Sequence, residues 1–188
     1  MERRLKLQKE AEPEWARRIS EHPGCEGIFS CLQCGACSGT CPLSIYMDFG
    51  PRRIIALVRE GFRTAALSSE TIWLCASCYA CAVHCPRQIH VTDIMYTLKR
   101  EAIEAKLYPR RLPIPVLAQE FYRAVRSRGK NAEFWVVLRM AVKSNPLILL
   151  SMIHTGWALL RTGRLSLHSE HADGIAEIKR YLDMREVA

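Results

Sequence analysis

Nine cysteines supply most of the chemistry available to this chain of 188 residues, and eight of them lie in two runs of identical spacing. In each run, two residues separate the first three cysteines, three residues precede the fourth, and a proline follows it. The eight residues are Cys31, Cys34, Cys37, Cys41, Cys75, Cys78, Cys81 and Cys85. Thiolates are soft ligands, so this repeated grouping predicts metal binding rather than a disulfide framework.

The spacing also indicates which metal group is bound. Three cysteines at two-residue gaps, a fourth three residues later and a following proline are typical of [4Fe-4S] clusters. Structural zinc is the alternative, but a zinc site usually takes two separated Cys-x2-Cys pairs and needs no such run. We therefore expect two [4Fe-4S] clusters.

The same pattern predicts the ligand sets, because in it the distant fourth cysteine of one run serves the cluster of the other run. The first set is Cys31, Cys34, Cys37 and Cys85, and the second is Cys75, Cys78, Cys81 and Cys41. The short gaps place successive sulfurs on one concave surface, toward which backbone N–H groups point. Four cysteines per cluster leave no iron open to substrate. The sequence thus predicts one-electron transfer, no catalytic residue and no small-molecule substrate bound directly by this chain.

Two residues near the runs have a role that the sequence leaves open. Cys25 belongs to neither run, and we expect a buried structural thiol, with a redox or replacement ligand as the alternative. His84 directly precedes Cys85. It is interpreted as an ordinary loop histidine, with a hydrogen bond that tunes a cluster as the alternative.

The elements that position the cysteines are predicted to be helical, so the fold class is mainly α. A helix starts at Gly50-Pro51 and stops at Gly61, and another is capped at Thr92-Asp93 and ends before Pro109. A short helix over 69–74 leads into Cys75. These elements predict an α-helical ferredoxin domain over 25–109.

The flanks are also expected to be helical. An N-terminal helical segment, 1–24, contains a helix from Pro13 to Glu21, and a C-terminal extension, 110–188, is expected to dock a partner. Helices are predicted there over 115–126, from a cap at Asn131 onward, over 147–161 and over 172–184. The apolar run 147–160 is too short to span a bilayer, so any membrane contact is expected to be peripheral.

Net charge and cysteine content restrict the expected partners and cellular compartment. The net charge is +8, and basic residues concentrate over 99–130, which suits an acidic partner or a solvated helix face. No nucleic-acid motif is visible, so nucleic acid is not an expected partner. The N-terminus lacks the apolar core of a signal peptide, and clustered thiols suit a reducing compartment, so we expect a cytoplasmic protein.

Segments 29–42 (FSCLQCGACSGTCP), 72–81 (IWLCASCYAC), 85–87 (CPR) and 91–94 (VTDI) resemble the C subunit of heterodisulfide reductase. The likeness covers about residues 25–107. It implies a helical two-cluster ferredoxin that passes electrons between the A subunit, which carries flavin and iron-sulfur clusters, and the catalytic B subunit, which carries Cys-Cys-Gly segments.

The tail, 110–188, resembles those of bacterial heterodisulfide-reductase-like complexes, including complexes of sulfur oxidation. The resemblance implies an electron-transfer subunit of an oxidoreductase in sulfur metabolism, acting on sulfur held by a lipoate-binding protein. Two other interpretations stay open. One is the iron-sulfur subunit of another flavin-dependent oxidoreductase, and the other is a non-redox module with structural clusters and a basic nucleic-acid-binding face.

Overall fold

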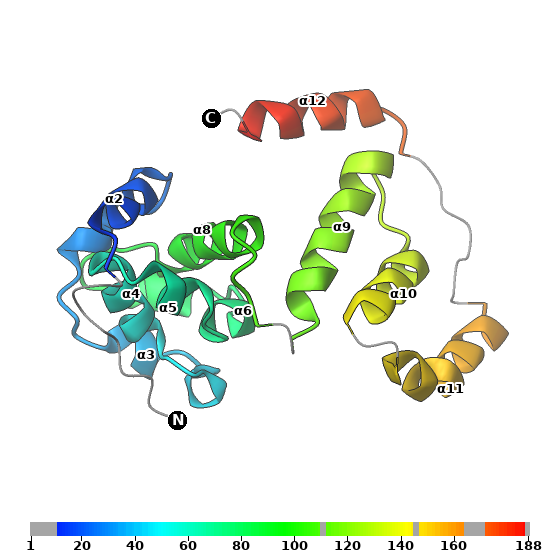
Figure 1. Cartoon of the computed structure of the whole chain (residues 1–188), viewed down its shortest axis with the longest axis horizontal. Helices are drawn as coiled ribbons and strands as arrows, with labels where there is room; N and C mark the ends of the chain where they lie inside the picture. The colour runs from blue at the N-terminus through cyan, green and yellow to red at the C-terminus, as the bar shows by residue number, and fades with distance from the viewer. Residues whose placement is uncertain (1–10, 110–111, 145–146, 164–171, 187–188) are drawn as a thin grey trace. The chain divides into compact units, whose positions relative to one another are not determined.

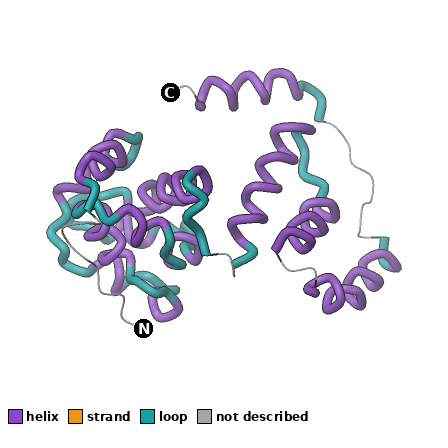
Figure 2. Tube along the Cα trace, viewed as in Figure 1, coloured by secondary structure: helices purple, strands orange, loops and turns teal. Residues whose placement is uncertain are grey.

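The structure is a computed structural model that describes residues 11–109, 112–144, 147–163 and 172–186. The chain forms two compact units, 1–109 and 110–188. Within the described residues every regular element is a helix, as Figure 2 shows. The mainly helical fold that the sequence predicts is therefore confirmed.

The first unit is built from a series of short helices (Figure 1). Its core is formed by apolar side chains that repeat at helical spacing. On α8 these are Ile94, Met95, Leu98 and Ala102, all at most 2% exposed. The elements are α2 (Pro13–Glu21), η1 (Glu26–Ser30), α3 (Ala36–Gly39), η2 (Ser44–Tyr46), α4 (Pro51–Arg59), α5 (Arg63–Leu67), α6 (Thr71–Leu74), α7 (Ala80–Val83) and α8 (Val91–Glu104).

Helix α8 holds the unit together, since it packs against α5, α6 and α7. Helix α2 packs against α4 and η1, so the N-terminal helix is part of the same unit. Trp15 of α2 is buried, and its Nε1 donates to Glu101 Oε2 of α8 at 3.2 Å.

Gly61 ends α4 at φ +75°, where its carbonyl accepts a hydrogen bond from Glu12 N at 2.8 Å. A Cβ at this position would lie 2.6 Å from Glu12 O, so only glycine fits.

The longer helices follow the sequence prediction, and two predicted caps do not. Helix α2 has the expected bounds, and α4 begins at Pro51 as expected. Helix α8 begins at Val91 instead of being capped by Thr92 or Asp93. The cap prediction is wrong because both side chains are engaged elsewhere. Thr92 Oγ1 lies 3.6 Å from Cys81 Sγ, and Asp93 Oδ2 lies 3.2 Å from His90 Nδ1.

The second unit consists of α9 (Ile114–Arg128), α10 (Glu133–Ser144), α11 (Leu147–Arg161) and α12 (Ile175–Glu186). Helix α9 packs against α10 and α12, and α10 packs against α11. Gly129 ends α9 at φ +73°, as expected. The predicted cap at Asn131 is wrong, because Val136 N donates to Ala132 O, which places Ala132 at the start of α10.

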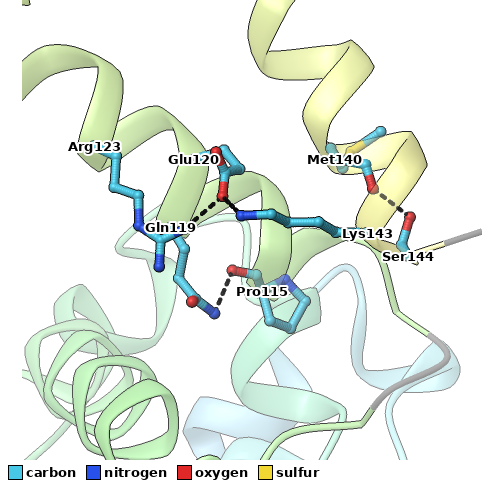
Figure 3. A network of polar contacts seen from close by, with 7 residues as sticks. All are labelled: Pro115, Gln119, Glu120, Arg123, Met140, Lys143 and Ser144. Carbon is cyan, nitrogen blue, oxygen red and sulfur yellow. Dashed lines mark hydrogen bonds and ion pairs between the residues drawn. The ribbon is translucent and has the colours of Figure 1, made fainter.

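A buried carboxylate joins α9 to α10 (Figure 3). Glu120 is 2% exposed, and its Oε1 lies 2.6 Å from both Lys143 Nζ and Arg123 Nη1. The hydrogen bond from Lys143 and the two positive charges lower the pKa of Glu120 below its usual value, against the opposing effect of burial. Arg126 pairs with Asp183 at 2.8 Å. Two basic residues of the stretch 99–130, Arg123 and Arg126, therefore form ion pairs inside this unit.

Helix α11 is the apolar run that the sequence singles out. It has the predicted bounds, and along the part of the chain that the structure describes no helix is long and apolar enough to span a bilayer. Several large apolar side chains of α11 are exposed: Leu147, Leu150, Ile153, Trp157 and Leu160.

Candidate iron-sulfur centre

The two cysteine runs fold alike at the level of single residues. Gln33 and Ser77, each two residues after the first cysteine of its run, both have φ +56°. Gly35 and Tyr79, each directly after the second cysteine, have φ of +88° and +61° and cap α3 and α7. Four positive φ values at matching positions show that the sequence repeat is also a repeat of backbone conformation.

This conformation suits an anionic cluster. Left-handed residues within a turn point successive backbone N–H groups toward one side and form an anion-binding nest. In the first run, Gln33 N donates to Cys31 Sγ at 3.5 Å, and Gln33 Nε2 donates to the same sulfur at 3.4 Å. The sulfur that is predicted to bind iron is therefore also the acceptor of these N–H groups.

The first predicted ligand set meets at one hollow. Its lining includes Cys31, Cys34 and Cys37 of the first run together with Cys85 of the second. Ile55, Ile89 and Val91 supply apolar walls, and Arg52 and Arg87 supply positive charge. An all-sulfur donor set beside basic residues fits a [4Fe-4S] cluster, whose core and four thiolates together carry negative charge.

The second predicted set contains three thiols of the second run. The charges of Cys75 and Cys78 act on Cys81, which places these three thiols near one another. Thr92 Oγ1 lies 3.6 Å from Cys81 Sγ. Helix α7, which contains Cys81, packs against α3, which contains Cys37. The assignment of Cys41 to this set stays a prediction.

Crowding of the thiols has an electrostatic consequence. Burial, together with the neighbouring charges of Cys31 and Cys81, raises the pKa of Cys37 to about 11. Such thiols ionise readily only when a cationic metal core lies among them. Among the residues that the structure describes, no three His, Cys, Asp or Glu side chains converge on a single ion. A cubane distributes its four ligands over four irons and so needs no such convergence.

The two residues with open roles lie in different environments. Cys25 is fully buried, and its thiol donates to Thr97 Oγ1 at 3.5 Å. Burial raises the pKa of Cys25, so it stays a neutral thiol, as the interpretation of a structural cysteine expects. His84 is exposed.

The structure adds residues that sequence reasoning missed. Arg59 Nη1 donates to Cys31 O at 2.8 Å, and Lys99 Nζ donates to Cys75 O at 3.2 Å. The segment after Cys41 also contributes Asp48, which accepts hydrogen bonds from the start of α6. In the repeated segments 57–60 (LVRE) and 98–101 (LKRE), Arg59 matches Arg100 rather than Lys99, so the sequence repeat does not identify these two contacts.

Comparison with known proteins agrees with this geometry. The 4Fe-4S dicluster domain family matches residues 26–89, which contain all eight cysteines of the two runs. This segment is therefore similar to a 4Fe-4S dicluster domain. The match indicates two [4Fe-4S] clusters, as the paired runs predict, and disfavours the zinc alternative.

Several curated relatives of this chain are C subunits of heterodisulfide reductases. The C subunit of a ferredoxin:CoB-CoM heterodisulfide reductase of Methanosarcina acetivorans is 36% identical over 90 residues, 48% of this chain and 36% of the relative. Its counterpart in Methanosarcina mazei is 41% identical over 76 residues, 40% of this chain and 47% of the relative. The C subunit of an H2:CoB-CoM heterodisulfide,ferredoxin reductase of Methanothermobacter marburgensis is 31% identical over 92 residues, 49% of each chain.

Between 40% and 49% of this chain is thus similar to C subunits of heterodisulfide reductases. The chain spans about half the length of these curated relatives or less. The printed names of these relatives make each of them one subunit of a reductase complex.

Proposed function

We propose that this protein is the electron-transfer subunit of a heterodisulfide-reductase-like complex of sulfur metabolism. Its partners in this proposal are an A subunit with flavin and iron-sulfur clusters and a catalytic B subunit with Cys-Cys-Gly segments. The observation that carries the proposal is the hollow lined by Cys31, Cys34, Cys37 and Cys85, which joins the two runs. The names of the curated relatives support the complex, and the resemblance of the tail supports sulfur metabolism.

In this proposal the chain binds and orients the clusters and leaves substrate chemistry to the partners. The eight cysteines hold two [4Fe-4S] clusters, which supply one-electron transfer when bound. Gln33 directs its N–H groups toward Cys31 Sγ, and Ser77 has the same backbone conformation in the second run. The helices α4 and α8 each contribute a basic side chain that donates to the backbone of a run. We place the protein in the cytoplasm, because clustered cysteines that bind metal are typical of a reducing compartment.

The experiment is anaerobic purification of the native complex, with quantification of iron and sulfide, EPR of the reduced protein and identification of every co-purifying protein. We expect about eight irons per chain, as two cubanes require, and a Cys-Cys-Gly partner. Eight irons without such a partner would favour the iron-sulfur subunit of another flavin-dependent oxidoreductase. Bound zinc, or redox-silent clusters with salt-dependent DNA binding, would reject electron transfer altogether.

We further propose that residues 110–188 dock another protein of the complex. The support is the apolar row on α11, where Leu150 and Trp157 are 66% and 69% exposed and lie seven residues apart on one face. We expect the double variant Leu150→Ser, Trp157→Ser to keep its iron but lose the co-purifying proteins. Tyr181→Ser on α12, also at an exposed position, is the matched control. Full assembly of the double variant would reject the docking role.

A further inference from the structure

Each cysteine run is held from outside by one basic side chain. Arg59, the last residue of α4, donates from Nη1 to the carbonyl oxygen of Cys31 at 2.8 Å. Lys99, in the middle of α8, donates from Nζ to the carbonyl oxygen of Cys75 at 3.2 Å. In both repeats the acceptor belongs to the first cysteine of the run, and the donor comes from a helix that follows that run. The two contacts are therefore similar, although Arg59 and Lys99 do not occupy matching positions of the sequence repeat.

Neither positive charge is neutralised by a carboxylate among the residues that the structure describes. The nearby carboxylate of Glu101 contacts Arg63 Nε at 3.6 Å and Trp15 Nε1 at 3.2 Å instead. Arg59 Nε is buried without a hydrogen-bond partner in the described part of the chain. Lys99 Nζ lies 5.3 Å from the centre of the Tyr96 ring. Both charges are thus partly withdrawn from water and directed at the backbone of a cysteine run.

A positive charge in this position affects the reduced state of a cluster more than the oxidised state. A cluster with four thiolates is anionic, and reduction adds one further negative charge. A nearby cation stabilises the more negative state, and it does so more strongly where water is partly excluded. The reduction potential of the cluster on that run must therefore rise with the charge.

We propose that Arg59 and Lys99 set the reduction potentials of the two clusters separately through their positive charges. Arg59 acts on the cluster bound by the Cys31 run, and Lys99 acts on the cluster bound by the Cys75 run. The inference rests on the proposed function, because it requires one cluster on each run. It assigns to each of the helices α4 and α8 a redox role in addition to its packing role. The two potentials can then change independently by substitution at one position each.

The test compares the full-length, cluster-loaded chain with Arg59→Gln and Lys99→Gln, which keep a hydrogen-bond donor but remove the charge. The measurement is an anaerobic titration with dithionite as reductant, followed by EPR. We expect each variant to lower one of the two potentials by about 59 mV, a tenfold change in the equilibrium constant of a one-electron couple. The two variants must affect different clusters. Arg100→Gln, at an exposed position next to Lys99, removes the same charge and is the matched control.

The outcomes separate the inference from the proposed function. Iron and sulfide analysis comes first, and a wild-type chain without two clusters rejects the proposed function itself. With both clusters present, equal shifts of both potentials, or shifts no larger than those of Arg100→Gln, overturn the inference alone. Arg59→Lys and Lys99→Arg keep the charge and must keep the wild-type potentials. If Arg59→Gln does not retain both clusters, the Lys99→Gln result decides.

Discussion

Asp48 and Thr71 connect the two cysteine repeats through a short set of hydrogen bonds. Asp48 Oδ1 accepts from Thr71 Oγ1 at 2.7 Å and from Thr71 N at 2.9 Å, and Ser69 Oγ donates to the same oxygen at 2.8 Å. Asp48 lies after the first run, and Thr71 begins α6, which leads directly into Cys75. One carboxylate therefore fixes the start of the second run relative to the end of the first.

We expect Asp48→Asn to lower the free energy of unfolding of the loaded protein by about 1–3 kcal/mol, because donors at the start of α6 lose their charged acceptor. The midpoint of guanidinium unfolding, followed by the visible absorption of the clusters, measures this. Burial raises the pKa of Asp48, but the hydrogen bonds from Thr71, Ser69 and the backbone lower it below 3.8 overall.

The sign of the Asp48 shift determines the pH dependence. A lowered folded pKa gives stability that is complete above the unfolded pKa and is lost as pH falls through the folded pKa. The difference between wild type and Asp48→Asn is therefore expected to be constant from about pH 6 to about pH 9. Glu104→Gln, at an exposed position on α8, is the control. An equal effect of Glu104→Gln would show that Asp48 has no special role.

The shared hollow predicts which serine variants resemble one another. Cys34→Ser and Cys85→Ser are expected to perturb the same EPR signal, although the two residues belong to different runs. Cys78→Ser and Cys41→Ser are expected to perturb the other signal. If Cys85→Ser instead matches Cys78→Ser, each run holds its own cluster and the crossed ligand sets are wrong.

The matching left-handed positions predict opposite responses to substitution. At Gly35, φ +88° disfavours any side chain, so Gly35→Ala is expected to cost about 1–2 kcal/mol. Tyr79 already bears this strain at φ +61°, so Tyr79→Gly is expected to cost nothing. Gly39→Ala in α3 is the control, since no atom lies within 4 Å of the added Cβ. Guanidinium midpoints of the loaded variants measure these effects, and a stable Gly35→Ala would contradict the strain argument.

Cys25 is predicted to be structural and unreactive. We expect Cys25→Ala to retain both clusters, because the thiol contacts Thr97 and lies outside both runs. In the folded wild type at about pH 8, iodoacetamide is expected to leave Cys25 unlabelled, since burial raises its pKa and excludes the reagent. Mass spectrometry of tryptic peptides measures the labelling. Loss of iron in Cys25→Ala, or rapid labelling of native Cys25, would refute this assignment.

The sequence by itself determined the cluster type and the longer helices. The spacing of Cys31, Cys34 and Cys37 is a local property, because two-residue gaps define a ligand loop wherever the chain places it. Helix α2 follows from its starting proline and apolar periodicity, and α11 from an apolar run that ends at Arg161. These features depend on neighbours a few residues away, so a linear pattern contains them.

Only the tertiary structure decided which side chains other than the cysteines contact the two runs. The short helices α3 and α7 contain four residues each, too few to show periodicity, and their left-handed caps follow from the fold of the run. The contacts of Arg59 and Lys99 and the hydrogen bonds of Asp48 join residues distant in the chain, whereas the meeting of Cys85 with Cys31 was already predicted from the cysteine pattern. Packing of α8 against α5, α6 and α7 creates this arrangement, and no local spacing records it.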